Sequence, residues 1–164
     1  MNFKILYNYF VAQPESKWIM KGDNAFELYK FIKRYPIKRI LDLGTGIGCS
    51  AAIMALALKE KGEKDVHIDS LEQFDKCIKL ANEMIPKELK EYITVHKGEV
   101  EMWRPKEIPY QAFLNFKEVP RWDYDLILND GPSPFKDNER FIDFPNGTIH
   151  KAVMKGKIKP GTFI

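Results

Sequence analysis

A glycine-rich segment at residues 42–50, DLGTGIGCS, has the composition of a ligand-binding turn. It follows an apolar run of strand length and precedes an Ala-rich, nearly all-apolar segment over residues 50–58. Small residues in a strand-to-helix turn let the backbone approach a ligand, and the N–H groups at the start of the helix suit polar or anionic groups. We therefore expect a binding site here. A dinucleotide fingerprint wants glycine or alanine where this chain has Cys49, so the spacing disfavours a nicotinamide oxidoreductase.

Three acidic residues lie at or near the ends of later apolar runs. Glu72 ends DVHIDSLE, Glu99 lies in KGEV, and Asp130 follows YDLILN. A carboxylate can accept two hydrogen bonds from a diol, and it can also act as a general base or hold a divalent metal. Each residue also has a purely structural interpretation. Glu72 would be a charge at a helix N-terminus, Glu99 a solvated loop residue, and Asp130 the cap of an Asp-Gly-Pro turn.

The segment LDLGTGIG resembles the first motif of class I S-adenosylmethionine-dependent methyltransferases in residue type, spacing and position after the first strand. The resemblance implies that S-adenosylmethionine is the cofactor and that Asp42 orients its amino group. It also implies that the backbone of the turn lines the cofactor's carboxylate and ribose, through Gly44, Thr45, Gly46 and Gly48. The alternative is a glycine turn that serves only to reverse the chain.

The resemblance extends to the next two strand ends. By it, Glu72 binds both ribose hydroxyls, and Gln73 and Phe74 flank the adenine. KGEV resembles the third family motif, in which Glu99 and the N–H of Val100 address the adenine edge. The family more often has Asp followed by a small residue at this place, so the longer Glu99 side chain is a departure from the pattern.

LILNDGPSP resembles the fourth family motif and implies that Asp130 faces the methyl donor and acceptor. The segment is neither the Asn-Pro-Pro-Tyr type of amino methyltransferases of DNA bases nor the Pro-Cys type of cytosine carbon methyltransferases. This favours an oxygen acceptor on a small or sugar-like molecule, with Asp130 as catalytic base or as a ligand for Mg²⁺. A non-catalytic S-adenosylmethionine-binding module of the same fold is the second hypothesis. His150 is a further base candidate, although a solvated helix histidine is the plainer interpretation.

Strand and helix patterns alternate around these residues, which predicts a doubly wound, mostly parallel α/β sheet. We expect strands in RILDL, DVHIDSLE, ITVHKGEV, YDLILN and GTFI, and helices over residues 25–35, 50–58, 77–85 and 148–155. Asn24 and Glu27 are spaced as a capping box for the first helix. Residues 1–23 show no sustained period. The sequence ends within the fifth strand, without the family's last two strands, which predicts an exposed sheet edge and self-association.

The composition is that of a single globular domain over residues 1–164, in which residues 1–36 are an N-terminal lead-in and helix. Hydrophobic residues make up 45% and charged residues 30%, and the net charge is only +3. Basic residues are interspersed with acidic ones, so nothing indicates a nucleic-acid partner. Cys49 and Cys77 have no metal-ligand spacing and are expected to be reduced thiols. The sequence shows no signal-peptide pattern and no apolar run near the roughly 20 residues of a membrane span, so we expect a cytoplasmic protein.

Overall fold

The centre of the fold is a four-stranded sheet in which every pair of neighbouring strands is parallel. The computed structural model describes residues 1–132, 135–136, 139–140 and 145–164. The strand order is β3-β2-β1-β6, with β1 at Arg39–Leu43, β2 at His67–Glu72, β3 at Ile93–Lys97 and β6 at Leu126–Asn129. The predicted α/β architecture is confirmed. The expected fifth strand is reduced to one isolated parallel bridge, between Leu126 and Phe163.

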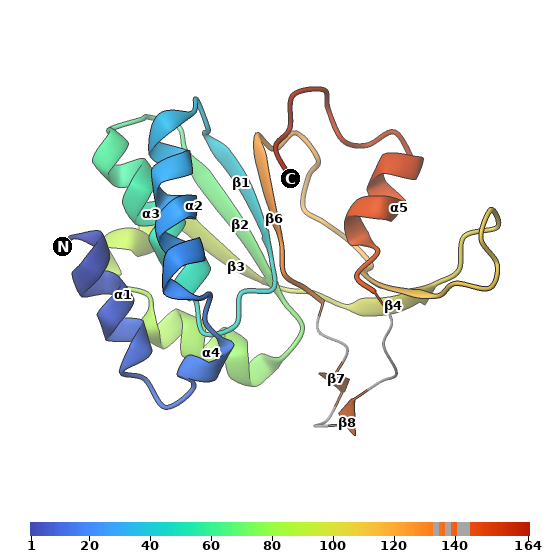
Figure 1. Cartoon of the computed structure of the whole chain (residues 1–164), viewed down its shortest axis with the longest axis horizontal. Coiled ribbons are helices and arrows are strands. Elements are labelled where there is room, and N and C mark those ends of the chain that lie inside the picture. The colour runs from blue at the N-terminus through green and yellow to red at the C-terminus, as the bar shows by residue number, and fades with distance from the viewer. Residues whose placement is uncertain (133–134, 137–138, 141–144) are drawn as a thin grey trace.

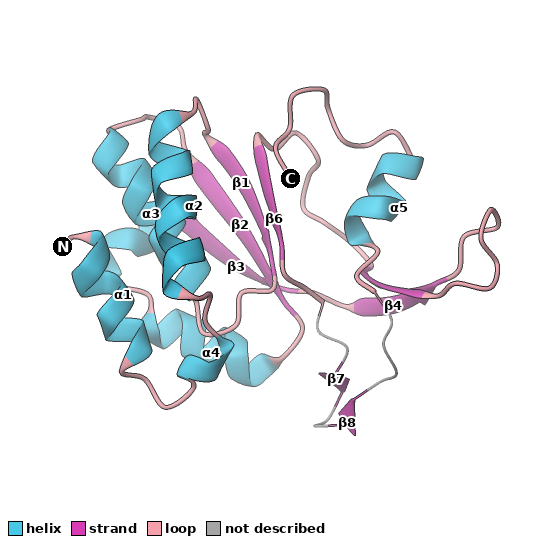
Figure 2. Ribbon diagram, viewed as in Figure 1, coloured by secondary structure: helices cyan, strands magenta, loops and turns pink. Residues whose placement is uncertain are grey.

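Four helices cover one face of this sheet, on the left in Figures 1 and 2. They are α1 (Phe3–Val11), α2 (Gly22–Arg34), α3 (Cys49–Lys61) and α4 (Asp75–Met84). Every residue of α3 from Cys49 to Leu58 is buried, as its almost uninterrupted apolar sequence predicts. The helix ends at Gly62, whose φ of 72° gives the left-handed cap that glycine favours. A short 3₁₀ helix, η2 (Lys87–Tyr92), links α4 to β3.

The other face is covered more thinly. Its apolar core is formed by Leu41, Leu43, Leu71, Phe116, Tyr124 and Ile127. An antiparallel hairpin of β4 (Val100–Trp103) and β5 (Phe113–Phe116) extends from this side and carries α5 (Thr148–Met154), on the right in Figure 1. β7 (Phe135–Lys136) and β8 (Glu139–Arg140) pair with each other in antiparallel fashion. Among the described residues no helix is both long and apolar enough to cross a bilayer.

The N-terminal segment is more ordered than predicted. Residues 1–23 contain α1 and the 3₁₀ helix η1 (Ser16–Trp18). The side chain of Asn2 caps α1 by accepting the N–H of Ile5 at 3.0 Å, and Leu6 and Phe10 are buried one helical turn apart. The predicted capping box of the next helix is wrong. Because α2 already begins at Gly22, Asn24 and Glu27 lie inside it, and its N-cap residue makes no side-chain cap.

The third predicted strand is also wrong in its extent, because it breaks at Gly98 into two strands of different sheets. β3 ends at Lys97, and Val100 begins β4. The ring of Phe116 packs directly on the backbone at Gly98, where a Cβ atom would lie 2.4 Å from two ring carbons. Only glycine admits this packing, and the chain turns out of the main sheet at that point.

Candidate functional site

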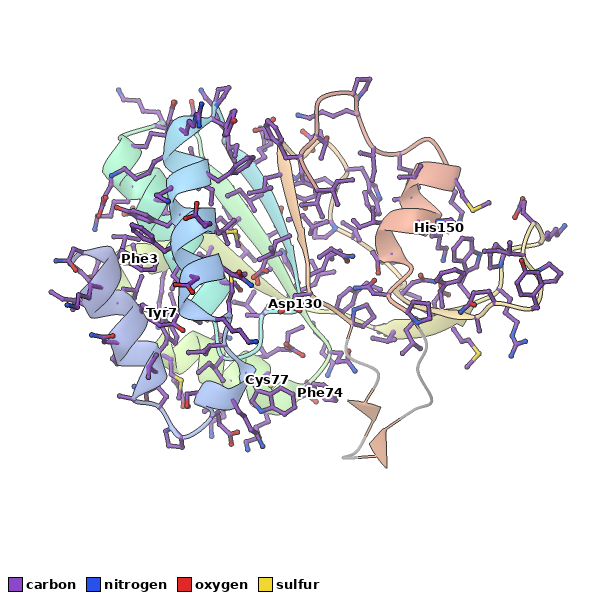
Figure 3. All side chains as sticks on the ribbon, in the orientation of Figure 1. Phe3, Tyr7, Phe74, Cys77, Asp130 and His150 are labelled. Atoms are coloured by element: carbon purple, nitrogen blue, oxygen red, sulfur yellow. The ribbon has the colours of Figure 1, made fainter. Side chains whose placement is uncertain are left out.

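The structure brings most of the predicted site residues to one edge of the sheet, where β1, β2 and β6 end. Asp42 lies in β1, the glycine turn connects β1 to α3, and Glu72 is the last residue of β2. Asp130 directly follows β6 and lies at the lower end of the sheet in Figure 3. Parallel strands that end together create the crevice in which α/β sheets bind ligands.

Asp42 is completely buried, and only one of its two carboxylate oxygens has hydrogen-bond partners. Its Oδ2 accepts hydrogen bonds from the hydroxyls of Ser50 at 3.0 Å and Ser70 at 2.7 Å, whereas its Oδ1 has no hydrogen-bond partner. Burial raises the pKa of Asp42 to about 7, although the two hydroxyl donors oppose this shift. A buried carboxylate oxygen that accepts no hydrogen bond lowers the free energy of unfolding, and a ligand that donates to it removes this cost. The arrangement therefore suits a ligand that brings a cationic donor such as an ammonium group.

Ser50 and Ser70 were not among the predicted site residues. Ser70 lies beside Asp42 because β1 and β2 pair in that register. Ser50 reaches Asp42 from the first turn of α3. Strand alternation already places Ser70 and Glu72 on one face of β2, which is the signal that points toward Ser70.

The glycine turn holds β1 and β6 in close approach. A Cβ atom on Gly44 would lie 2.9 Å from the carbonyl carbon of Asp130, and one on Gly131 would lie 2.8 Å from the Cα of Gly44. The backbone N–H of Asp130 donates to the carbonyl of Leu43 at 2.9 Å. Asp130 is thereby fixed beside the turn with its side chain exposed, and partial desolvation raises its pKa.

Glu72 ties the glycine turn to the loop before α4. Its Oε2 accepts the N–H of Gly46 at 2.8 Å, and its Oε1 accepts the N–H groups of Gln73 at 2.8 Å and Phe74 at 3.0 Å. The side chain is only 5% exposed, and burial raises its pKa against the effect of these donors. A carboxylate has about four acceptor positions, so Glu72 retains capacity for a ligand hydroxyl. Binding of a ribose diol by Glu72 remains a prediction.

Most of the backbone N–H groups of the glycine turn already donate hydrogen bonds to other groups of the protein. The N–H groups of Gly44 and Thr45 both donate to the carbonyl of Leu71, at 2.9 and 3.2 Å, and that of Gly48 donates to the carbonyl of Thr45 at 2.9 Å. The hydroxyl of Thr45 is buried against that of Ser70, 2.6 Å away. These residues would thus serve a ligand mainly by leaving room for it.

Residues on the adenine side of the predicted site are less closely grouped. Glu99 is exposed and forms an ion pair with Lys117 at 2.9 Å, which lowers the pKa of Glu99. It remains near the edge, because the N–H of the adjacent Gly98 donates to the carbonyl of Glu72 at 2.8 Å. Phe74 is half-buried at the start of α4. Contacts of Glu99, Val100, Gln73 and Phe74 with an adenine remain predictions.

None of the three histidines lies among these residues. His67 and His96 are half-buried beside Asp69, 3.6 and 2.7 Å from its Oδ1. His150 is exposed on α5, stacks on Phe113, and lies well away from Asp130 in Figure 3. Within the described parts of the chain, no cluster of three or more His, Cys, Asp or Glu side chains is arranged to hold a metal ion. Binding of Mg²⁺ by Asp130 stays a prediction, and Cys49 and Cys77 are both free.

Comparison with known proteins identifies the family to which the chain belongs. Residues 7–123 match the model of the family described as protein-L-isoaspartate(D-aspartate) O-methyltransferase. Among solved structures, the S-adenosylhomocysteine-bound methyltransferase PaMTH1 of Podospora anserina is similar, with a TM-score of 0.63 and 15% identity over 96% of this chain and 58% of that chain. The O-methyltransferase TomG of Streptomyces achromogenes, in complex with S-adenosylmethionine, has a TM-score of 0.55 and 18% identity over 82% of this chain and 56% of its own.

At these identities the two structures establish similarity of fold, and this chain spans less than two thirds of the length of either. No curated protein matches the sequence.

Proposed function

Because this chain belongs to the protein-L-isoaspartate(D-aspartate) O-methyltransferase family, we propose that it is an S-adenosylmethionine-dependent O-methyltransferase. The observation that carries the proposal is the orphaned Oδ1 of Asp42, buried beside the glycine turn. The α-ammonium group of the cofactor is a donor of the required charge. The structure contains no other described aspartate or glutamate with an unpaired, fully buried oxygen.

The other residues of the edge would bind the rest of the cofactor. Glu72 would accept from the ribose, and Gln73, Phe74 and Glu99 would surround the adenine. When bound, the cofactor supplies an electrophilic methyl group on its sulfonium. The contribution of the protein is then mainly positioning, which holds an acceptor oxygen in line with that methyl group. We also propose a cytoplasmic location, which the two free cysteine thiols support.

Two oxygen acceptors deserve separate tests. A hydroxyl group on a small or sugar-like molecule fits the O-methyltransferase fold and is our leading proposal. The description of the family favours a second acceptor, the carboxylate of an isoaspartyl residue. The two acceptors differ in one chemical requirement. A hydroxyl has to lose its proton during transfer, whereas a carboxylate is already ionised near neutral pH. Asp130, exposed beside the glycine turn, is the group we assign to receive the hydroxyl proton.

Calorimetric titration tests the cofactor assignment. We expect S-adenosylhomocysteine to bind and NAD not to bind. Asp42→Asn removes the charge that the ammonium group contacts, and hydrogen bonds to charged groups contribute about 1.5–3 kcal/mol, so its Kd should rise at least about tenfold. Asp65→Asn is the matched control, because Asp65 is exposed at a φ of 57°, a conformation that Asn tolerates. Binding of NAD in place of S-adenosylhomocysteine would contradict the proposal.

Single-turnover assays with Asp130→Asn separate the acceptors. On a hydroxyl acceptor the rate should fall about 10²- to 10⁴-fold with the affinity for cofactor unchanged, and high pH should partly restore it. On an isoaspartyl peptide the same variant should react at the parent rate. Equal rates of parent and variant on a hydroxyl acceptor would leave Asp130 as a turn residue. Cofactor binding without transfer to any acceptor would support the non-catalytic module instead.

A further inference from the structure

The connection between α1 and α2, residues 13–21, runs across the glycine turn. A Cβ atom on Gly46 would lie 3.0 Å from the backbone oxygen of Trp18 and 3.8 Å from its Cβ. Gly46 is also the residue whose N–H is held by Glu72. Trp18 therefore lies directly over the part of the turn that faces the end of β2.

Both sides of this connection are anchored. On the α1 side, the hydroxyl of Tyr7 donates to the carbonyl of Met20 at 3.1 Å. On the α4 side, Glu15 forms an ion pair with Lys76 at 2.5 Å. The segment thus reaches from α1 across Gly46 to the first turn of α4, which begins just after Glu72 and the next two residues. In Figure 3 the labels of Tyr7, Phe74 and Cys77 mark this side of the molecule.

We propose that residues 13–21 form a strap over the bound cofactor, in which Trp18 contacts the adenosine half and the Glu15–Lys76 ion pair holds the strap closed. The proposal rests on the proposed function, because the strap crosses the residues assigned to S-adenosylmethionine. Trp18 is 50% exposed although it lies beside this turn. An indole presents a large apolar face with one polar N–H, and such faces stack well on nucleobases.

The closing contact is weak enough to open. Lys76 is 72% exposed on its side chain, and exposed ion pairs contribute little to stability because water screens them. A strap held in this way can release and readmit a cofactor on each turnover. Trp18 would then leave and return with the segment.

Tryptophan fluorescence tests the contact. Trp103→Phe combined with Trp122→Phe leaves Trp18 as the sole tryptophan of the chain. Titration with S-adenosylhomocysteine should change its emission with the Kd found by calorimetry, and methylthioadenosine, which keeps the adenosine half, should change it in the same direction. Trp18→Ala should raise the Kd about fivefold or more. Calorimetric binding without a fluorescence change would overturn the strap alone, whereas absence of calorimetric binding would overturn the proposed function as well.

Stopped-flow measurement of cofactor release tests the closing contact. We expect Lys76→Met to speed dissociation of S-adenosylhomocysteine by about 1.5- to 5-fold, the range that corresponds to an exposed ion pair. Glu15→Gln should have the same effect, and the double variant should add nothing further. Lys79→Met is the control, because Lys79 lies on the same helix, is 76% exposed and, among the described residues, pairs with Glu83 of that helix at 4.0 Å. Equal dissociation rates for Lys76→Met and Lys79→Met would refute the ion pair as the closing contact.

Discussion

Asp42 combines two properties that rarely occur in one carboxyl group, full burial and an unused acceptor oxygen. The hydroxyls of Ser50 and Ser70 stabilise its charged form, but burial outweighs them and raises the pKa of Asp42 to about 7. The free protein therefore carries a group whose ionisation is unfavourable near neutral pH. A bound ammonium group would reverse this preference by pairing with Oδ1.

The raised pKa of Asp42 predicts how stability depends on pH. A carboxyl whose folded pKa lies above its unfolded value of about 3.9 adds stability at low pH, and this contribution is lost as the pH rises through about 7. Between pH 5 and 8, the free energy of unfolding of the parent should fall relative to that of Asp42→Asn, by about 2–3 kcal/mol. Urea unfolding at each pH measures the difference. Saturating S-adenosylhomocysteine should reduce the slope, and a pH-independent difference between the two proteins would contradict the assignment.

Glu72 has a structural role that its position alone did not reveal, because three backbone N–H groups donate to it. Glu72→Ala leaves those donors without a partner and removes the proposed ribose contact. We expect the Kd for S-adenosylhomocysteine to rise about tenfold or more and the free energy of unfolding to fall by about 1–3 kcal/mol. Calorimetry and urea unfolding measure the two effects. Glu83→Ala, on the exposed side of α4, is the control, and a destabilised variant with parental affinity would limit Glu72 to holding the turn.

At this scale the sequence predicted that the glycine turn, Glu72 and Asp130 would lie together where the strands end, because their types and strand-end positions repeat a family pattern. Their binding roles stay predictions. The partners of those residues could not be predicted. The contact between Asp42 and Ser70 depends on the β1–β2 register, which one sequence does not specify. The approach of Trp18 to Gly46 depends on how a segment without periodicity folds back.

Among the elements, the β4–β5 hairpin departs most from what the sequence predicts. The sequence predicts that these residues are the end of one strand followed by a long aromatic connection. Pro105 and Pro109, between β4 and β5, interrupt the alternation of apolar and polar residues that would indicate a hairpin. The hairpin is specified instead by tertiary packing of Phe116 on Gly98. The elements with almost uninterrupted apolar sequences, such as β1 and α3, were predicted well because burial on both sides leaves little choice of residue type.

Gly98→Ala tests this packing. The added methyl group would overlap the Phe116 ring, which is buried, so we expect the free energy of unfolding to fall by about 1–3 kcal/mol. In a Phe116→Leu background the same substitution should be less destabilising, because the ring is gone. Urea unfolding of the four proteins in this cycle gives the coupling. Additive effects of the two substitutions would show that the ring does not require glycine at position 98.

The whole molecule is asymmetric about its sheet. Four helices bury one face, whereas the other is covered by a hairpin, a short helix and a polar network around Asp69. In that network the buried hydroxyl of Tyr124 donates to Oδ2 of Asp69 at 2.9 Å, and His96 contacts Oδ1. The network fastens the chain just before β6 to the back of β2. The proposed cofactor site lies where β1, β2 and β6 end, at the boundary between the two faces. The strap of residues 13–21 lies on the face that the four helices cover.

We expect the protein to self-associate through the outer edge of strand β6. Only the bridge between Leu126 and Phe163 is recorded there in the described chain, and Phe163 and Ile164 beside it are 37% and 64% exposed. Unpaired strand edges next to exposed apolar side chains tend to pair with another chain. We expect light scattering to show a molar mass that rises toward that of a dimer with concentration. Ile164→Lys should keep the protein monomeric by placing a charge at this edge, whereas Ile5→Lys, at a side chain that is 58% exposed on α1, should behave like the parent. A parent that stays monomeric across the series would show that the single bridge and the neighbouring side chains of α2 suffice to protect the edge.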